Sequence, residues 1–595
     1  MLWAYQQSLN PLQNEFLSTV VAALPVVVLF VLLVPLRWLA PKAALGGAVT
    51  AVLVAVVAYG MPADMALLAL LDGALFGLMP VGWTIFNAML LYNITVETGQ
   101  FAVVRRSVAG LSGDARIQAI LIGFAFGAFL EGAAGGGTPV AICGAIMVGL
   151  GFDPFLAAVL CLIANTSPVA YGGLGTPLIT LTGVTDLPTA TLSVMAGHQL
   201  PMLSFIVPLW MVKCMCTWKQ TWEVWPALLA SGLSFAVFQY TFATFHVYTG
   251  VELWPMTDIG GGIFSLLVTA LLLRFWRPRN EWHFDRASRD GKKIVSPVAK
   301  TSGAQTEEPL TARKIVIAWM PFALMSLALF GLGLVRQVEG ERQRLKQEMP
   351  RIGPIQTTYP IAIAGLHKEV YRDQRLLSPG KAAEPEKAEF HFVWLTGPGT
   401  PVFFAAVASM LFLRMNRRQI GAVFRRTFLQ MKIPVPTIAL MLGLSYVTRY
   451  AGMDATLGVA FAATGVLYPF FAALLGWLGV FLTGTDAGSN ALFGSLQKIT
   501  ATEIFNQHPH LFPDLSLTQT QILICTANST GGVMGKMIDA QSICVATAAT
   551  HQIGREADIF KAVVWHSIIL ASIVGAIVLL QAYVFPFTML VPAVK

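Results

Sequence analysis

The sequence predicts an all-α polytopic membrane protein with roughly 12–14 transmembrane segments in two inverted repeats, with broken helices or re-entrant hairpins. Apolar side chains make up 55% of the 595 residues and only 12% are charged, about half the charged share of soluble domains. The apolar runs are long and continuous, which excludes the alternating strands of a membrane β-barrel. Two polar, glycine-rich interruptions also resemble each other in the two halves of the chain.

Nine apolar runs are long enough for continuous spans: 16–36, 43–60, 190–212, 223–245, 259–275, 314–335, 394–413, 433–451 and 562–585. Four further apolar stretches are broken by Gly, Pro and polar residues: 63–101, 117–183, 457–505 and 519–553. The stretch 63–101 is long enough for two spans, yet the loops that flank it require one. We therefore expect a broken or interfacial helix there.

The net charge of +8 is a topology signal rather than a nucleic-acid signal, because the basic residues cluster in short loops between spans. The basic loops expected in the cytoplasm contain Arg37 and Lys42, Arg105 to Arg116, Lys213 and Lys219, Arg274 to Lys314, Arg414 to Lys432, and Arg555 and Lys561. The predicted organisation is a first membrane repeat at 1–276, a cytoplasmic basic linker at 277–313, a span at 314–335, an extracytoplasmic insertion at 336–393 and a second membrane repeat at 394–595.

The paired interruptions are the strongest pointer to a site. Residues 127–136 read GAFLEGAAGG and residues 479–488 read GVFLTGTDAG, with five of ten positions identical. Each is followed by a second match, ANTS at 164–167 and ANST at 527–530, which gives site motifs 127–183 and 479–543. Unpaired backbone groups are costly in hydrocarbon and survive where they line a cavity. If residues 457–483 hold one crossing, the charged loops place the two copies in opposite orientations, as expected for alternating access.

Two carboxylates in these motifs are the candidates for proton coupling. Glu131 follows an apolar run, where an unpaired carboxylate costs several kcal/mol. It is predicted to carry a proton or gate the substrate, and the alternative is that it caps the free amides of a broken helix. Asp486 is predicted as a proton or coupling-ion site, and its alternative is the N-cap of the next helix.

The predicted substrate-binding residues supply hydroxyl groups, amides, flexible backbone and one cation: Gly132, Gly136, Thr138, Asn165, Thr166, Ser167, Thr485, Ser489, Asn490, Asn528, Ser529, Thr530 and Lys536. Pro168 and the glycines at 531–532 are expected to end helices, so that half-helix N-termini face the cavity and bind an anion. Lys536 either neutralises the substrate or pairs with Asp539 at the membrane edge.

No enzyme motif, cofactor site or metal site is predicted. The six cysteines show no C-x-x-C spacing, and Gly135 to Gly137 are not followed by the G-K-[ST] of a phosphate loop. The absence of a nucleotide-binding domain argues against an ATP-driven pump.

The long motifs GAFLEGAAGGGTPVA, VGLGFDPFLAAVLCLIANTSPVAYG, LGWLGVFLTGTDAGSNALF and ANSTGGVMGKMIDAQSI resemble the L-lactate permease family of bacterial proton symporters. The resemblance implies uptake of L-lactate, D-lactate or glycolate with protons across the bacterial inner membrane. It also implies an inverted-repeat fold of the ion-transporter kind and a homodimer. The expected partners are thus a small carboxylate, protons and the lipid bilayer, and no nucleic acid.

The chain departs from the family pattern at two places. An aromatic-Gly-Ala-Pro sequence is usual where this chain has Gly136, Gly137, Thr138 and Pro139, and Asp539-Ala540 replaces a usual Ser-Pro. These changes favour a larger or more polar hydroxycarboxylate as a second candidate substrate. A sodium-coupled carboxylate transporter is a competing hypothesis for the function. A transporter-fold receptor or assembly component is another, and it is motivated by the insertion 336–393.

Overall fold

The computed structural model describes residues 4–33, 35–36, 38–135, 137–284, 310–344, 348–374, 385–397, 399–462 and 464–593. Within these residues, ten helices are long and apolar enough to cross a membrane. The number rises to eleven if α17 (Arg417–Met431) and α18 (Pro434–Ala451), bent by 41°, form one span. The expected 12–14 crossings also included shorter apolar helices that fall below this length, such as Thr138–Leu150, Pro154–Ala164 and Gly399–Phe412. Arg37, Gly136 and most of the linker 277–313 lie outside the described residues.

The nine continuous runs form helices close to their expected bounds, because a backbone in hydrocarbon must pair its N–H and C=O groups within the segment. Besides α18, they are α1 (Glu15–Leu33), α2 (Ala40–Val57), α11 (Thr189–Met215), α13 (Trp225–Thr249), α14 (Thr257–Phe275), α15 (Ala312–Arg344), α16 (Gly399–Phe412) and α24 (Glu556–Tyr583).

The stretch 63–101 contains one candidate span, Ala63–Glu97, which is interrupted, so the expected broken helix is confirmed; that it crosses the membrane once stays a prediction. It consists of α3 (Ala63–Phe76), a π-helical turn and α4 (Trp83–Glu97), with Met79 outside helical geometry at φ −142°. Gly77 lets this turn approach α18, because a Cβ there would lie 2.6 Å from the Cα atom of Ala439.

The first site motif forms a hairpin followed by an interrupted helix. Its elements are α6 (Ala115–Gln118), a π-helical segment (Ala119–Phe126), α7 (Gly127–Ala134), α8 (Thr138–Leu150), α9 (Pro154–Ala164), a 3-10 turn (Val169–Tyr171) and α10 (Gly172–Thr185). Gly135 and Gly137 have φ angles of +63° and +84°, which side-chain-bearing residues rarely adopt, so glycine makes the tight turn between α7 and α8 possible.

The second site motif has the same order of elements: α19 (Met453–Ala462), α20 (Tyr468–Thr483), α21 (Asp486–Gln507), α22 (Leu517–Gly535) and α23 (Ala540–Ala549). One expectation was wrong here, since the stretch 528–532 does not break and the interruption falls at 536–539. Gly531 instead allows α22 to pack closely against α20, because a Cβ there would lie 2.2 Å from the carbonyl oxygen of Ala473 in α20.

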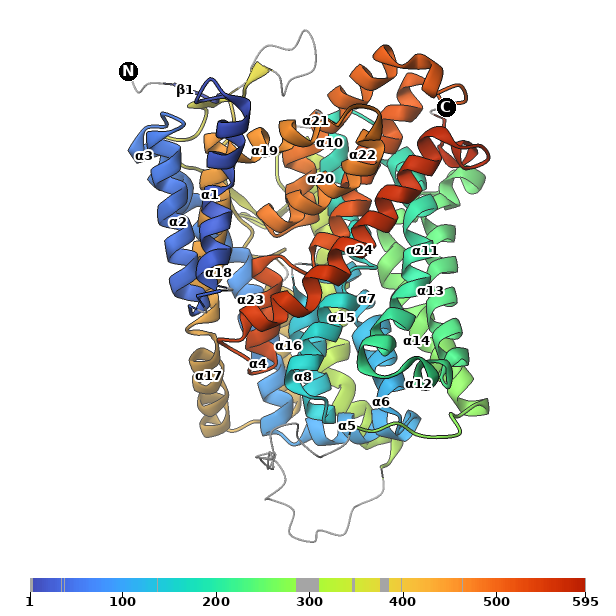
Figure 1. Ribbon diagram of the computed structural model, residues 1–595. Helices are drawn as coiled ribbons and strands as arrows, with labels where there is room; N and C mark the ends of the chain where they lie inside the picture. The colour runs from blue at the N-terminus through green and yellow to red at the C-terminus, as the bar shows by residue number, and fades with distance from the viewer. Residues whose placement is uncertain are drawn as a thin grey trace.

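The two motifs meet in the middle of the molecule. The half-helix α23 packs against α8 and α9, whereas α10 packs against α21 and α7. In Figure 1, α1, α2, α3 and α18 stand on one side of this centre, and α11, α13 and α14 stand on the other. The two motifs are therefore held between two groups of long helices.

The two ends of the molecule differ in character. Both termini lie at the upper end in Figure 1, whereas α5 (Gln100–Leu111), α6, α12 (Trp218–Trp222) and α17 lie at the lower end. Basic residues of three loops expected in the cytoplasm lie in or beside these four helices, among them Arg106, Arg116, Lys219 and Arg425. These loops thus share one end, as a common cytoplasmic location requires.

The described part of the insertion 336–393 contains five short strands, one of which attaches it to the segment before the first span. They are β2 (Arg351–Ile352), β3 (Ile355–Gln356), β4 (Tyr359–Ala362), β5 (Val370–Tyr371) and β6 (Glu389–Phe392). β4 and β6 are antiparallel with Tyr359 opposite Phe392, and β5 pairs in parallel with β1 (Tyr5–Gln6). The segment preceding the first span is therefore fastened to the insertion by backbone hydrogen bonds.

Candidate functional site

Five buried charged side chains gather where the interrupted helices meet. They are Glu131, Asp258, Asp486, Lys536 and Asp539, and none is more than 3% exposed. They come from α7, α14, α21 and the interruption between α22 and α23. Four carboxyl groups thus share one ammonium group. We call these five side chains the charge cluster.

Lys536 connects the interruption of the second helix to the tip of the second hairpin. Its Nζ atom lies 3.2 Å from Oδ2 of Asp539 and donates a 2.7 Å hydrogen bond to the carbonyl oxygen of Gly484, which follows α20. Asp539 also caps α23 by accepting from the backbone N–H of Ser542 at 2.7 Å. The pair expected at the membrane edge therefore forms, but in the buried centre rather than at the edge.

Glu131 lies near the end of α7 and faces the start of α10. A Cβ on Gly172 would lie 3.0 Å from Oε1 of Glu131, and no side chain caps α10. Oε2 makes no hydrogen bond within the described residues. The side chain lies beside Asn165 and within electrostatic range of Lys536 and Asp539. This position suits both the coupling role and the capping alternative.

Asp258 is a member of the cluster that the sequence motifs did not indicate. It is fully buried in the first turn of α14, and neither carboxyl oxygen has a hydrogen bond within the described residues. It is next to Glu131, because a Cβ on Gly132 would lie 2.9 Å from Cβ of Asp258. A carboxylate at the start of an apolar run was its only sequence signal.

Asp486 does not cap α21. Thr485 is the N-cap, and its hydroxyl accepts from the backbone N–H of Gly488 at 2.9 Å. The capping alternative for Asp486 is therefore wrong. Its Oδ2 atom instead accepts a hydrogen bond from Ser529 of α22, so the carboxylate joins the second hairpin to that helix.

Three predicted substrate-binding residues hydrogen-bond to one another. Asn528 donates to Oδ1 of Asn490 at 2.8 Å and to Oγ of Ser489 at 3.2 Å, and it accepts from Gln497 at 2.9 Å. Asn490 donates to the carbonyl oxygen of Pro177 at 3.1 Å. This network fastens α21, α22 and α10 together.

The remaining predicted residues fall into two groups. Thr530 donates to Oε1 of Gln199 at 2.6 Å, and Thr166 donates to the carbonyl oxygen of Ile163 at 2.7 Å. The second group has buried polar atoms with no hydrogen bond within the described residues: Thr138, Asn165 and Ser167, together with Gln541 and Ser542, which lie in the second site motif but were not predicted to bind substrate. This second group has capacity left to bind a ligand.

A small cavity borders the charge cluster. It is lined by side chains of α1, α18, α20 and α23, and it includes Gly484 and Gln541. The carbonyl group of Gly484 accepts from Lys536, so the cavity lies beside the cluster's only cation.

These features define a multi-pass membrane transporter with a buried polar centre. The chain belongs to the L-lactate permease family, whose sequence profile matches residues 18–585. It is 41% identical to the glycolate permease GlcA of Escherichia coli (strain K12), over 98% of each chain. It is 38% identical to the L-lactate permease of Bacillus subtilis (strain 168), over 98% of this chain and 99% of that one. The L-lactate permease of Escherichia coli (strain K12) is 37% identical over 98% of each chain.

The family resemblance seen in the motifs is thus confirmed over nearly the full length. The protein is a permease rather than an enzyme, and it is a multi-pass membrane protein homologous to bacterial inner-membrane permeases.

Proposed function

We propose that the protein imports a small 2-hydroxy monocarboxylate, such as lactate or glycolate, together with protons. The relatives named as glycolate and L-lactate permeases support this substrate class. The observation that carries the coupling is the charge cluster, in which four buried carboxyl groups surround one lysine.

The imbalance of charge in the cluster supports proton symport. The ammonium group of Lys536 can neutralise the charge of one carboxylate of the cluster. Each further carboxylate that is ionised and unpaired in this buried site costs several kcal/mol. An incoming carboxylate adds another negative charge. A proton taken up with it restores the balance, so the loaded site can reorient without carrying an unpaired anion. Glu131 is the first candidate for that proton and Asp486 the second.

The substrate has two groups to be recognised. For its carboxylate we propose Lys536 and the N-terminal amides of α8, which follow Gly137 and have no side-chain cap. For its 2-hydroxyl group we propose Asn165 and Gln541, and for the further hydroxyl group of a more polar acid we propose Thr138. The buried polar atoms of these three side chains lack partners within the described residues.

We further propose that the two site motifs are inverted repeats that provide alternating access. Each consists of a hairpin followed by an interrupted helix, and each half-helix packs on the hairpin of the other motif, α23 on α8 and α10 on α21. The gathering of basic residues at one end supports a cytoplasmic location for that end. The homodimer implied by the family resemblance stays a prediction.

The coupling role is tested with purified protein in proteoliposomes. Glu131→Gln should abolish accumulation of labelled lactate or glycolate driven by a pH gradient and spare counterflow, because exchange needs no net proton movement. Glu503→Gln is the matched control, since Glu503 is an exposed carboxylate on α21. Unchanged accumulation by the Glu131 variant would reject its role.

The same assay separates the competing hypotheses. Uptake that follows a sodium gradient and survives a protonophore would replace proton coupling by sodium coupling. Correct membrane insertion without transport of any hydroxy acid would favour a receptor or assembly role.

A further inference from the structure

Helix α17 carries an unbalanced positive charge. The stretch from 414 to 432 contains six basic residues and no acidic one: Arg414, Arg417, Arg418, Arg425, Arg426 and Lys432. The helix packs against α4 at the lower end of the molecule (Figure 1). A segment with this composition attracts anions to the surface on which it lies.

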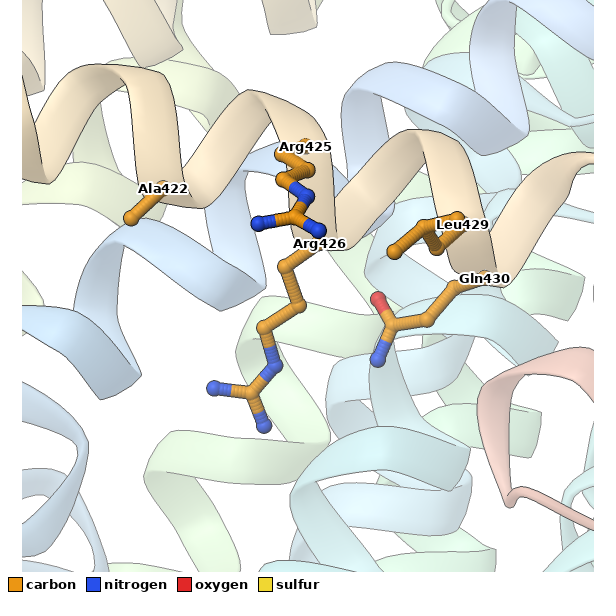
Figure 2. A pocket seen from close by; sticks show the side chains of 5 residues that line it. All are labelled: Ala422, Arg425, Arg426, Leu429 and Gln430. Carbon is orange, nitrogen blue, oxygen red and sulfur yellow. The ribbon is translucent and has the colours of Figure 1, made fainter.

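Part of this charge surrounds a pocket on the helix surface. The pocket is lined by Ala422, Arg425, Arg426, Leu429 and Gln430, and Figure 2 shows Arg426 and Gln430 extending to the same side of α17. Neither guanidinium group has an ion pair or hydrogen bond within the described residues. Oε1 of Gln430 accepts from Asn93 of α4 at 2.8 Å, so the Gln430 side chain is held in place and its amide N–H groups stay free to donate.

Apolar side chains are exposed beside these arginines. Phe428 is 63% exposed, Leu429 50% and Ile433 41%. A helix that combines exposed apolar side chains with arginines has the composition of an interfacial helix. A small soluble anion could satisfy the arginines, but it would leave these apolar groups in water.

We propose that the pocket formed by Arg425, Arg426 and Gln430 binds the phosphate group of an anionic phospholipid of the cytoplasmic leaflet. Guanidinium groups match phosphate oxygens in geometry and charge, and the Gln430 amide adds a donor. The acyl chains cover Phe428 and Leu429. The assignment to the cytoplasmic leaflet depends on the proposed orientation of the protein in the membrane. The preference for an anionic headgroup does not depend on it.

Lipid binding is tested by native mass spectrometry of the purified full chain, titrated with phosphatidylglycerol and with phosphatidylcholine. The pocket variant combines Arg425→Gln with Arg426→Gln. The control combines Arg417→Gln with Arg418→Gln, which removes the same charge from exposed positions of the same helix outside the pocket. The pocket variant should bind phosphatidylglycerol about 30-fold more weakly than the unmodified protein, and the control within about threefold.

Several outcomes would overturn the proposal. Equal loss in both variants would show a diffuse charge effect, and equal affinity for the two lipids would show no anion selectivity. Competition by inorganic phosphate at millimolar concentration would point to a site for soluble anions. A further variant, Phe428→Ser, should weaken phosphatidylglycerol binding, and unchanged binding would contradict the acyl-chain contact. None of these measurements requires transport, so they stand apart from the proposed function.

Discussion

The ammonium group of Lys536 lies 3.2 Å from the carboxylate of Asp539, and the two side chains are 2% and 0% exposed. The pair spans the interruption between α22 and α23, at the place where the proposed mechanism needs a cation for the substrate. In the proposed mechanism, a substrate carboxylate therefore competes with Asp539 for Lys536.

Asp539→Asn should strengthen substrate binding. Asparagine preserves the cap of α23 and removes the competing charge, so the dissociation constant for lactate or glycolate should fall about tenfold. The measurement is isothermal titration of purified protein, with the thermal shift produced by saturating substrate as a second readout. Asp153→Asn is the control, because Asp153 caps α9 through a 2.9 Å bond but is exposed. Weaker binding by Asp539→Asn would contradict the competition.

Two asparagines in equivalent motifs should behave differently. Asn165 has no side-chain hydrogen bond within the described residues, so Asn165→Ala should raise the substrate dissociation constant about tenfold at unchanged melting temperature. Asn528 holds three hydrogen bonds of the second hairpin, so Asn528→Ala should lower the free energy of unfolding by about 1–3 kcal/mol. Thermal melts and titrations of both variants test this contrast. Equal effects of the two changes would show that the asparagines share one role.

The membrane spans could be predicted because hydrocarbon forces each apolar segment to pair its own backbone, and the broken helix expected in 63–101 is present. The second helix interruption could not be placed. Pro168 lacks an N–H group and ends a helix, whereas Gly531 stays helical where α20 approaches its backbone. Asp258 was missed because its proximity to Glu131 joins segments that are distant in sequence.

The close approach of α20 and α22 depends on glycine at 476. A Cβ there would lie 1.9 Å from the carbonyl oxygen of Asn528. Gly476→Ala should therefore lower the free energy of unfolding by about 1–3 kcal/mol, since the atoms that the new methyl group meets belong to the backbone of α22 and cannot rotate away. Gly331→Ala in α15 is the control, because nothing lies within 4 Å of its added methyl group. Its effect should be neutral or stabilising by at most about 1 kcal/mol. Comparable destabilisation of both variants in thermal melts would contradict this packing role.

Protonation of Glu386 at low pH should destabilise the insertion 336–393. Burial alone would raise the pKa of Glu386, but the guanidinium groups of Arg372 and Arg449 outweigh it and lower that pKa below its usual value. Because its pKa is lowered on folding, the ionised Glu386 side chain stabilises the folded protein fully above the usual glutamate pKa of about 4.3. This contribution to the free energy of unfolding is lost as the pH falls below that value and Glu386 takes up a proton. The melting temperature should thus fall more steeply below this pH in the unmodified protein than in Glu386→Gln.

Glu348→Gln is the control for this pH dependence, because the Glu348 side chain is 80% exposed in its pair with Arg351. Exposed ion pairs contribute little to the free energy of unfolding. The melting temperature of Glu348→Gln should therefore depend on pH in the same way as that of the unmodified protein. An unchanged profile in Glu386→Gln would show that other groups govern the acid sensitivity.

Thr138 should set the preference for more polar acids. Its hydroxyl group is buried at the start of α8 and has no hydrogen bond within the described residues. Thr138→Ala removes this donor, so uptake of a 2,3-dihydroxy acid should fall about tenfold relative to lactate, the equivalent of one hydrogen bond.

Thr166→Ala is the control, because its hydroxyl already donates to Ile163 at 2.7 Å and should not distinguish substrates. The ratio of kcat/KM values for the two acids in proteoliposomes measures the effect. If Thr138→Ala left that ratio unchanged, Thr138 would not contact the additional hydroxyl group, and the departure from the family pattern at this position would lie outside substrate recognition.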